Sequence, residues 1–335
     1  MSHDERQLAA VLRVQPRTDP VGAVTEDDAA RRAAAYPLVR IGAPQFGHAI
    51  DLGNGQWQVH DLENDTPQQA RDTLAGRLRE QLADTADPAL AAELTAIDRL
   101  LDWEKVDQVE VAGREHRIVR ADTFARFGPD GPEPPRPTDP DPRQAEERDS
   151  FPAGNMVADP SAPTGPAEAA LKVELLTAHY PRAGVPAPVY DDSIAAVHSH
   201  PNGVLLPTRY AVAERVGGTW QPFTHAIDTP QHARDTLAFS FRYVQPRIAQ
   251  LTAEQAAAYE QAADHLDATR PDEITVLDRH FRITRVETLL RFSPEGPEGP
   301  RPSDYDPDPP PEAHAAQLRA QGRLPEPDVP PASAT

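Results

Sequence analysis

The amino-acid sequence predicts a mixed α+β protein made of two tandem copies of one module. The ten-residue block TPQQARDTLA at positions 66–75 returns as TPQHARDTLA at 229–238, with a single difference. Around each block, short stretches of alternating apolar residues precede two stretches with helical periodicity. Self-similarity at a fixed offset is typical of repeated structural units, so we expect two related domains.

The matching register extends well beyond this block. Trp57 matches Trp220, and residues 109–118 match 274–283. A proline-rich segment at 126–139, RFGPDGPEPPRPTD, matches RFSPEGPEGPRPSD at 291–304. The predicted organisation is an N-terminal arm, repeat 1 with its proline-rich tail, a connecting insert with one helix, repeat 2 with its proline-rich tail, and a disordered C-terminal tail. These segments are residues 1–25, 26–142, 143–191, 192–307 and 308–335.

Three strands followed by a capped helix are expected at the start of each copy. In repeat 1 the strand candidates are 38–41, 46–52 and 57–60, separated by Gly, Pro and Asn turn signals that indicate an antiparallel meander. Thr66 then stands as a helix N-cap, with Pro67 at the first helical position and Gln69 in a capping-box arrangement.

The rest of the module contains a second helix and a hairpin. An apolar stripe predicts a helix over 88–103, alternation over 109–118 predicts a hairpin, and a short helix is expected at 122–127 before the proline tail. The module is therefore β-β-β-α-α-β-β-α, with helices on one face of an antiparallel sheet and the two copies related by a pseudo-twofold. Further helices are expected at 166–180, docked on a domain, and at 313–321.

Composition excludes several classes of function. The chain of 335 residues contains no cysteine, which excludes disulfides, thiolate nucleophiles and cysteine metal sites and favours a cytoplasmic protein. The net charge of −20 opposes binding to nucleic acid. Neither a secretory leader nor a membrane helix is expected, because no sufficiently long apolar stretch is present.

The duplicated TPQxARDTL block and the RFxPxGPExPRP tail resemble a family of uncharacterised actinobacterial proteins, a domain of unknown function with a duplicated module. The resemblance covers most of residues 26–307. It implies a cytoplasmic bacterial origin and the two-copy layout. It implies no activity, cofactor or site residue.

His198 and His200 are the candidate metal ligands. The sequence HSHPNGVLLPT at 198–208 is similar to the start of the JAMM-type zinc isopeptidase signature, and two histidines in an i, i+2 relation on a strand share one face. The pattern then departs from the signature, because Arg209, Tyr210 and Ala211 stand where an aspartate ligand is required. Repeat 1 has Tyr36 at the position of His200. We therefore favour ordinary structural residues and expect no cofactor.

Arg71 and Arg234 are the candidate ligand- or anion-binding residues, since each lies early in a predicted helix, where an arginine can clamp an anion. Pairing with nearby acids is the favoured alternative. In the tails, Pro134, Pro135, Arg136, Pro300 and Arg301 are the candidate partner-binding residues, because polyproline segments fit aromatic grooves. Packing of each tail on its own sheet or on the other copy is favoured over binding to a partner.

Two other residue pairs have less specific signals. The repeated tryptophans Trp57 and Trp220 are expected to anchor the core, and His116 and His280 to be half-exposed strand residues without a catalytic role.

The leading functional hypothesis is a non-enzymatic protein-binding or regulatory module that binds a protein partner or forms a homo-oligomer. One alternative is a metal-dependent or other hydrolase with its site in the interdomain cleft. Another is an anion or small-ligand sensor.

Overall fold

The computed structural model describes residues 13–15, 19–142 and 156–325, whose 13 strands join in one sheet. Each pair of neighbouring strands is antiparallel, and the main path runs β10-β9-β12-β5-β2-β3-β7. The predicted mixed α+β class with an antiparallel sheet is confirmed. The expected N-terminal arm and C-terminal tail lie partly outside the described residues.

The elements fall into two halves with similar order, residues 20–130 (first half) and residues 187–295 (second half). The first half contains α2 (Pro20–Ala35), β1 (Leu38–Ile41), β2 (Gln45–Gly53), β3 (Gln56–Asn64), α3 (Pro67–Asp84), α4 (Pro88–Trp103), β4 (Gln108–Val111) and β5 (Arg114–Gly128). The second half contains α7 (Ala187–Ser199), β8 (Asn202–Leu205), β9 (Arg209–Val216), β10 (Thr219–Pro222), α8 (Pro230–Phe239), the π-helix η1 (Ser240–Val244), α9 (Gln245–Ile248), α10 (Ala253–Thr269), β11 (Glu273–Val276) and β12 (Arg279–Ser293).

The remaining elements follow or connect the halves. They are β6 (Gly131–Pro132), β7 (Met156–Ala158), α6 (Pro166–Thr177), β13 (Gly296–Pro297) and α11 (Pro311–Ala320). The strands and helices expected for repeat 1 up to residue 118 are confirmed to within a few residues. The expected three-stranded meander is wrong at its first strand, because β1 pairs with β5 and only β2 and β3 pair with each other as neighbours in sequence. The boundaries expected after residues 25 and 191 fall inside α2 and α7.

The matched helices α3 and α8 begin in the same way. The Thr66 hydroxyl accepts a hydrogen bond from the Gln69 backbone N–H at 3.2 Å, and the Thr229 hydroxyl accepts one from the His232 backbone N–H at 3.1 Å. A proline follows each threonine at the first helical position. The predicted N-cap therefore satisfies backbone donors that the helix itself leaves without partners.

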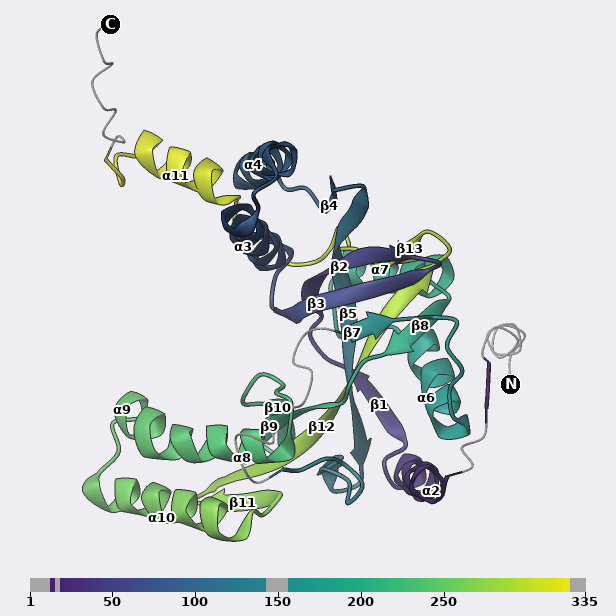
Figure 1. The fold of residues 1–335 in the computed structure, drawn as a ribbon. Coiled ribbons are helices and arrows are strands. Elements are labelled where there is room, and N and C mark those ends of the chain that lie inside the picture. The colour runs from purple at the N-terminus through teal and green to yellow at the C-terminus, as the bar shows by residue number, and fades with distance from the viewer. Residues whose placement is uncertain (1–12, 16–18, 143–155, 326–335) are drawn as a thin grey trace, which may run out of the picture.

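Each half has its own helix-covered core. Leu74 and Leu78 of α3 and Leu94 of α4 are buried against Ile118 of β5. In the second half, a corresponding cluster joins Leu237, Phe241, Tyr259 and Phe281. Figure 1 shows the pair α3 and α4 at one end of the molecule and the pair α8 and α10 at the other. The two helix pairs therefore leave the central part of the sheet to other elements.

The long strands β5 and β12 join the halves at the centre. They pair over four positions, where Thr123 lies opposite Thr288 and Asp122 lies opposite Leu289. The prediction of a helix at 122–127 is wrong, because β5 continues through these residues. Their backbone pairs with β12 and then with β1, so tertiary pairing decides their conformation.

The insert helix α6 docks on this centre, as predicted. Leu175 and Leu176 are buried together with Phe124 of β5 and Leu289 of β12. The helix ends at Thr177, earlier than expected. The short helix predicted near the C-terminus is confirmed as α11, which packs on α4. Among the described residues, no helix has the length and apolar character needed to span a membrane.

Candidate functional site

The proline-rich segments 131–141 (tail 1) and 296–306 (tail 2) cross between the halves. Tail 2 lies on the first half, where the Arg120 backbone N–H donates to the Glu298 carbonyl at 2.9 Å. Tail 1 lies on the second half, where the Arg285 backbone N–H donates to the Glu133 carbonyl, also at 2.9 Å. Each half is therefore bound by the tail that follows the other half.

Ion pairs repeat the same crossing. Arg120 pairs with Asp304 of tail 2 at 3.0 Å, and Arg285 pairs with Asp139 of tail 1 at 3.1 Å. All four side chains are at most 11% exposed. Water screens such pairs poorly, so the contacts hold the tails more firmly than surface ion pairs do.

Arg71 and Arg234, the predicted anion-binding residues, contact carboxylates of the chain itself. Arg71 binds Asp107 at 2.7 Å and Asp306 of tail 2 at 2.8 Å. Arg234 binds Asp272 at 2.5 Å and Asp141 of tail 1 at 2.9 Å. The two guanidinium groups are only 4% and 5% exposed. An external anion must displace these carboxylates before it can bind there.

The predicted partner-binding residues lie within the packed tails. Pro135 is buried, and Pro134 and Pro300 are half-buried. Arg136 pairs with Glu133 at 2.7 Å and Arg301 with Glu298 at 2.7 Å. These contacts place the prolines against the chain itself, as the favoured interpretation expected, while a role in binding a partner stays a prediction.

The strand on which His198 and His200 were expected is absent. His198 lies in the last turn of α7, and His200 is its C-cap. The strand geometry that would place both side chains on one face is therefore not present, and a metal site at these residues stays a prediction. The described residues contain no cluster of three or more histidine, aspartate or glutamate side chains able to hold a metal ion.

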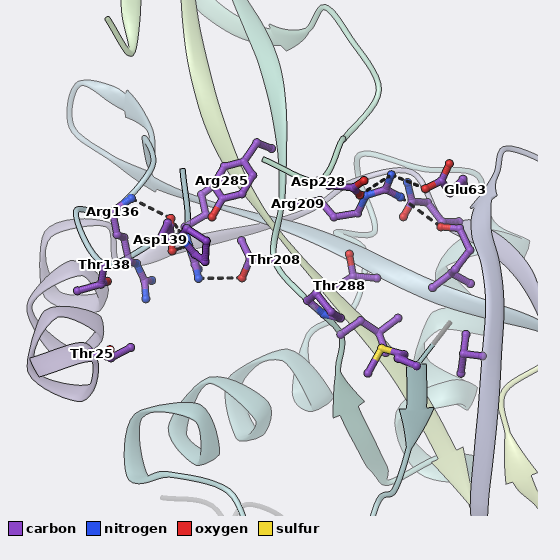
Figure 2. Close-up of a pocket in the computed structure, with 18 residues that line it drawn as sticks. Thr25, Glu63, Arg136, Thr138, Asp139, Thr208, Arg209, Asp228, Arg285 and Thr288 are labelled. Atoms are coloured by element: carbon purple, nitrogen blue, oxygen red, sulfur yellow. Dashed lines mark hydrogen bonds and ion pairs between the residues drawn. The ribbon is translucent and has the colours of Figure 1, made fainter. Parts of the chain in front are cut away.

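A pocket of about 360 Å³ (the junction pocket) lies where the halves meet. Its wall combines Val59 and Leu62 of β3 with Leu206 and Tyr210 of the second half, and tail 1 supplies Asp139. Figure 2 shows charged side chains in two groups, one around Arg285 and Asp139 and the other around Arg209 and Glu63. A volume of this size is typical of small-molecule sites.

Three residues that line this pocket each have a buried side-chain polar atom with no hydrogen-bond partner among the described residues. They are the Thr288 hydroxyl, the Arg209 Nε and the Gln45 side-chain carbonyl. Thr288 is only 2% exposed. A buried polar group without a partner costs about 1–3 kcal/mol, so a ligand that satisfies these atoms gains that energy.

The charges in the junction pocket are already paired. Arg209 binds Glu63 at 2.8 Å, and Arg285 binds both Asp139 and Thr208, the latter at 2.8 Å. Arg136 binds Glu133. Because each of these arginines already has a carboxylate partner, the pocket offers a neutral ligand better complementarity than an ionised one.

A second pocket, of about 590 Å³, is lined by Arg120 of β5, by Tyr180 and by residues of tail 2. Here the polar groups are satisfied. The Tyr180 hydroxyl in its wall donates to the Gly42 carbonyl at 2.9 Å, and the Ala43 carbonyl accepts from the Thr123 hydroxyl, which lies behind the wall, at 2.7 Å. Arg120 in its wall binds Asp304. The junction pocket therefore differs from this second pocket in having buried polar atoms without hydrogen-bond partners among its lining residues.

Sequence reasoning missed Thr288, Arg209 and Gln45. None lies in a motif, and they are brought together only when β2, β9 and β12 meet. The repeated tails were the available signal, since tail 1 forms part of the pocket wall. The sequence did not show that each tail lies on the other half.

Buried histidines form a further cluster beneath α3. His48 and His60 stack with ring centroids 4.9 Å apart, and His116 is 7% exposed rather than half-exposed as expected. Burial, together with the neighbouring His60, lowers the pKa of His48 to about 3, and burial lowers the pKa of His116 to about 4. Both are therefore neutral in the folded protein near neutral pH.

The tryptophans bind the crossed tails. Trp57 is buried in the core and lies against Gly296 of tail 2, while Trp220 lies against Gly131 of tail 1. The guanidinium of Arg117 lies 5.1 Å from the Trp57 ring centre and that of Arg282 lies 4.9 Å from the Trp220 ring centre. Trp57 is thus the core anchor that was expected, and it also contacts a tail.

These features define a mixed α+β protein with an antiparallel sheet, crossed proline-rich tails and a pocket at the junction of its halves. The chain belongs to the family of unknown function DUF5954, whose model matches residues 19–307. The match begins at the N-cap of α2 and ends directly after tail 2. No curated protein and no solved structure matches the chain.

Proposed function

We propose that the protein is a non-enzymatic module that binds a small neutral molecule in the junction pocket. The observation that carries the proposal is the Thr288 hydroxyl, which is buried in the pocket wall without a partner among the described residues. The structurally corresponding Thr123 hydroxyl donates to a backbone carbonyl. Buried hydroxyls are nearly always hydrogen-bonded, and the adjoining pocket gives a ligand room to be the partner of Thr288.

The proposal includes a duplicated module with a pseudo-twofold axis that passes between Thr123 and Thr288. These residues are 165 positions apart and oppose each other in the antiparallel pair. The same offset relates Arg120 to Arg285 and Asp139 to Asp304, which form the two crossed ion pairs. Duplication with crossed tails explains why the repeated tail sequence follows each half, and it creates a pocket on each side of the axis.

This function develops the small-ligand alternative at a different site from Arg71 and Arg234. Those arginines hold the tails in place, because Arg71 binds Asp306 of tail 2 and Arg234 binds Asp141 of tail 1. A regulatory role and binding to a protein partner or a second copy stay predictions. The hydrolase alternative loses the strand geometry on which the pairing of His198 and His200 was based, because His198 ends α7 and His200 is its C-cap.

The test uses butanamide as a neutral probe, with ligand-observed NMR on the full-length protein. The amide provides both an acceptor for the Arg209 Nε and a donor for the Gln45 carbonyl. We expect saturation transfer to butanamide with the wild-type chain. Thr25→Trp should abolish it, because Thr25 lies exposed at the wall of the junction pocket.

Val189→Trp is the matched control. Val189 lines the second pocket and occupies the position that corresponds to Thr25 in the second half. It should leave binding unchanged. Equal loss in both variants, or no saturation transfer with the wild-type protein, would contradict the proposed function.

A further inference from the structure

A groove of about 870 Å³ continues from the junction pocket between α2 and α6. The two cavities share wall residues, among them Thr25, Met156, Leu206 and Thr208. A molecule bound at Thr288 can therefore extend along the groove without leaving the protein surface.

Small side chains form much of the groove. Ala29 and Ala33 of α2 face Ala167 of α6, and Leu171 and Leu205 supply larger apolar surface. Alanine methyl groups leave room between the two helices for a narrow apolar group, and an unbranched hydrocarbon chain is narrow enough to fit there. Covering this surface with such a chain removes apolar area from water and favours binding.

Acidic side chains outnumber basic ones around the groove. The acids are Glu26, Asp27, Glu168, Glu174 and Glu287, and the bases are Arg126, Arg136 and Arg285. Arg126 is bound by Glu174, and Arg285 is bound by Asp139. An anionic ligand is disfavoured, since it meets net negative charge in the groove and only paired arginines in the pocket.

We propose that the ligand is a neutral amphiphile with an unbranched aliphatic chain. Its polar group binds Thr288, Arg209 and Gln45, while its chain lies between α2 and α6. This inference rests on the proposed function, because the polar group occupies the junction pocket. It adds the chemical class of the ligand and the direction in which the ligand extends.

The test compares butanamide, hexanamide and octanamide by calorimetric or NMR titration of the full-length chain. Each added methylene that enters the groove should tighten binding roughly fourfold, or on the order of 200-fold from butanamide to octanamide. Octanoate has the same chain length but a carboxylate, and it should bind at least about tenfold more weakly than octanamide at neutral pH.

Ala30→Phe tests the groove itself. Ala30 is an exposed groove residue on α2, whereas Ala34 is exposed on the same helix without lining the groove. Ala30→Phe should remove the gain from octanamide and leave butanamide bound as before, and Ala34→Phe should change neither. Equal affinities of butanamide and octanamide for the wild-type chain would overturn this inference alone. If neither amide binds, the proposed function fails with it.

Discussion

Thr123 and Thr288 lie opposite each other at the centre of the sheet, yet their hydroxyl groups differ in hydrogen bonding. The Thr123 hydroxyl donates to the Ala43 carbonyl at 2.7 Å, whereas the Thr288 hydroxyl has no partner among the described residues. The backbones around both threonines correspond, since the Thr123 carbonyl accepts from Gly42 and the Thr288 carbonyl accepts from Leu206. The difference is therefore confined to the side chains.

Replacing each threonine with valine measures this difference directly. Thr123→Val should lower the free energy of unfolding by about 1 kcal/mol, because it removes a buried hydrogen bond and leaves the Ala43 carbonyl with one acceptor contact fewer. Thr288→Val should leave stability unchanged or raise it by up to about 1 kcal/mol. Urea unfolding of both variants provides the measurement. Equal losses at the two positions would show that Thr288 already has a partner in the unliganded protein.

The crossed tails depend on two glycines beneath tryptophan rings. Gly296 has φ +124°, and a Cβ added there would lie 2.7 Å from Cζ2 of Trp57. Gly131 has φ +130° and lies beneath Trp220. Gly296→Ala and Gly131→Ala should each cost about 2–4 kcal/mol through backbone strain and overpacking.

Gly76→Ala is the control for these two variants. Gly76 lies inside α3, and an added Cβ there meets no atom within 4 Å. It should stabilise the protein by about 0.5–1 kcal/mol through helix propensity. Thermal unfolding should therefore move in opposite directions for Gly296→Ala and Gly76→Ala, and a shift in the same direction would contradict the packing described for the tails.

Local signals in the sequence predict the elements well. The bounds of α4 follow from its apolar stripe, and the start of α3 follows from Thr66 and Pro67. Residues 122–127 were misassigned because their strand pairing depends on partners distant in sequence, β1 and β12. Propensity and periodicity describe local preferences and contain no information about such partners.

The candidate site was less predictable than the fold. Arg71 and Arg234 were recognised as a matched pair, but their Asp306 and Asp141 partners come from tails whose path is a tertiary property. Thr288 stands in an ordinary strand pattern. Its significance depends on a missing hydrogen bond, which becomes visible only when β12 meets the pocket wall.

A double-mutant cycle on Arg71 and Asp306 tests the anchoring of tail 2. The two side chains are 2.8 Å apart and only 4% and 17% exposed, so we expect a coupling energy of about 1–3 kcal/mol between Arg71→Ala and Asp306→Ala. The pair Arg31–Asp27 on α2, at 67% and 69% exposure, should couple by less than about 0.5 kcal/mol. Additive effects at Arg71 and Asp306 in urea unfolding would mean that the tail is not held by this contact.

The buried histidines predict loss of stability in mild acid. The pKa of His48 falls from an unfolded value of 6.5 to about 3 in the folded protein, and that of His116 falls to about 4. Below pH 6.5 the unfolded chain therefore binds protons that the folded chain does not bind. Each histidine then lowers the free energy of unfolding by about 1.4 kcal/mol per pH unit, down to its folded pKa.

The pH dependence of urea unfolding between pH 7 and about pH 4 checks this linkage. His48→Gln stays neutral in both states, so its slope against pH should be shallower than that of the wild type by about 1.4 kcal/mol per unit. His116→Gln should act in the same direction, because the pKa of His116 is also lowered by burial. Carboxylates that titrate in this range without contacting a substituted histidine affect all these proteins alike and cancel in the comparison. A His48→Gln slope equal to that of the wild type would mean that His48 is protonated in the folded protein over this range.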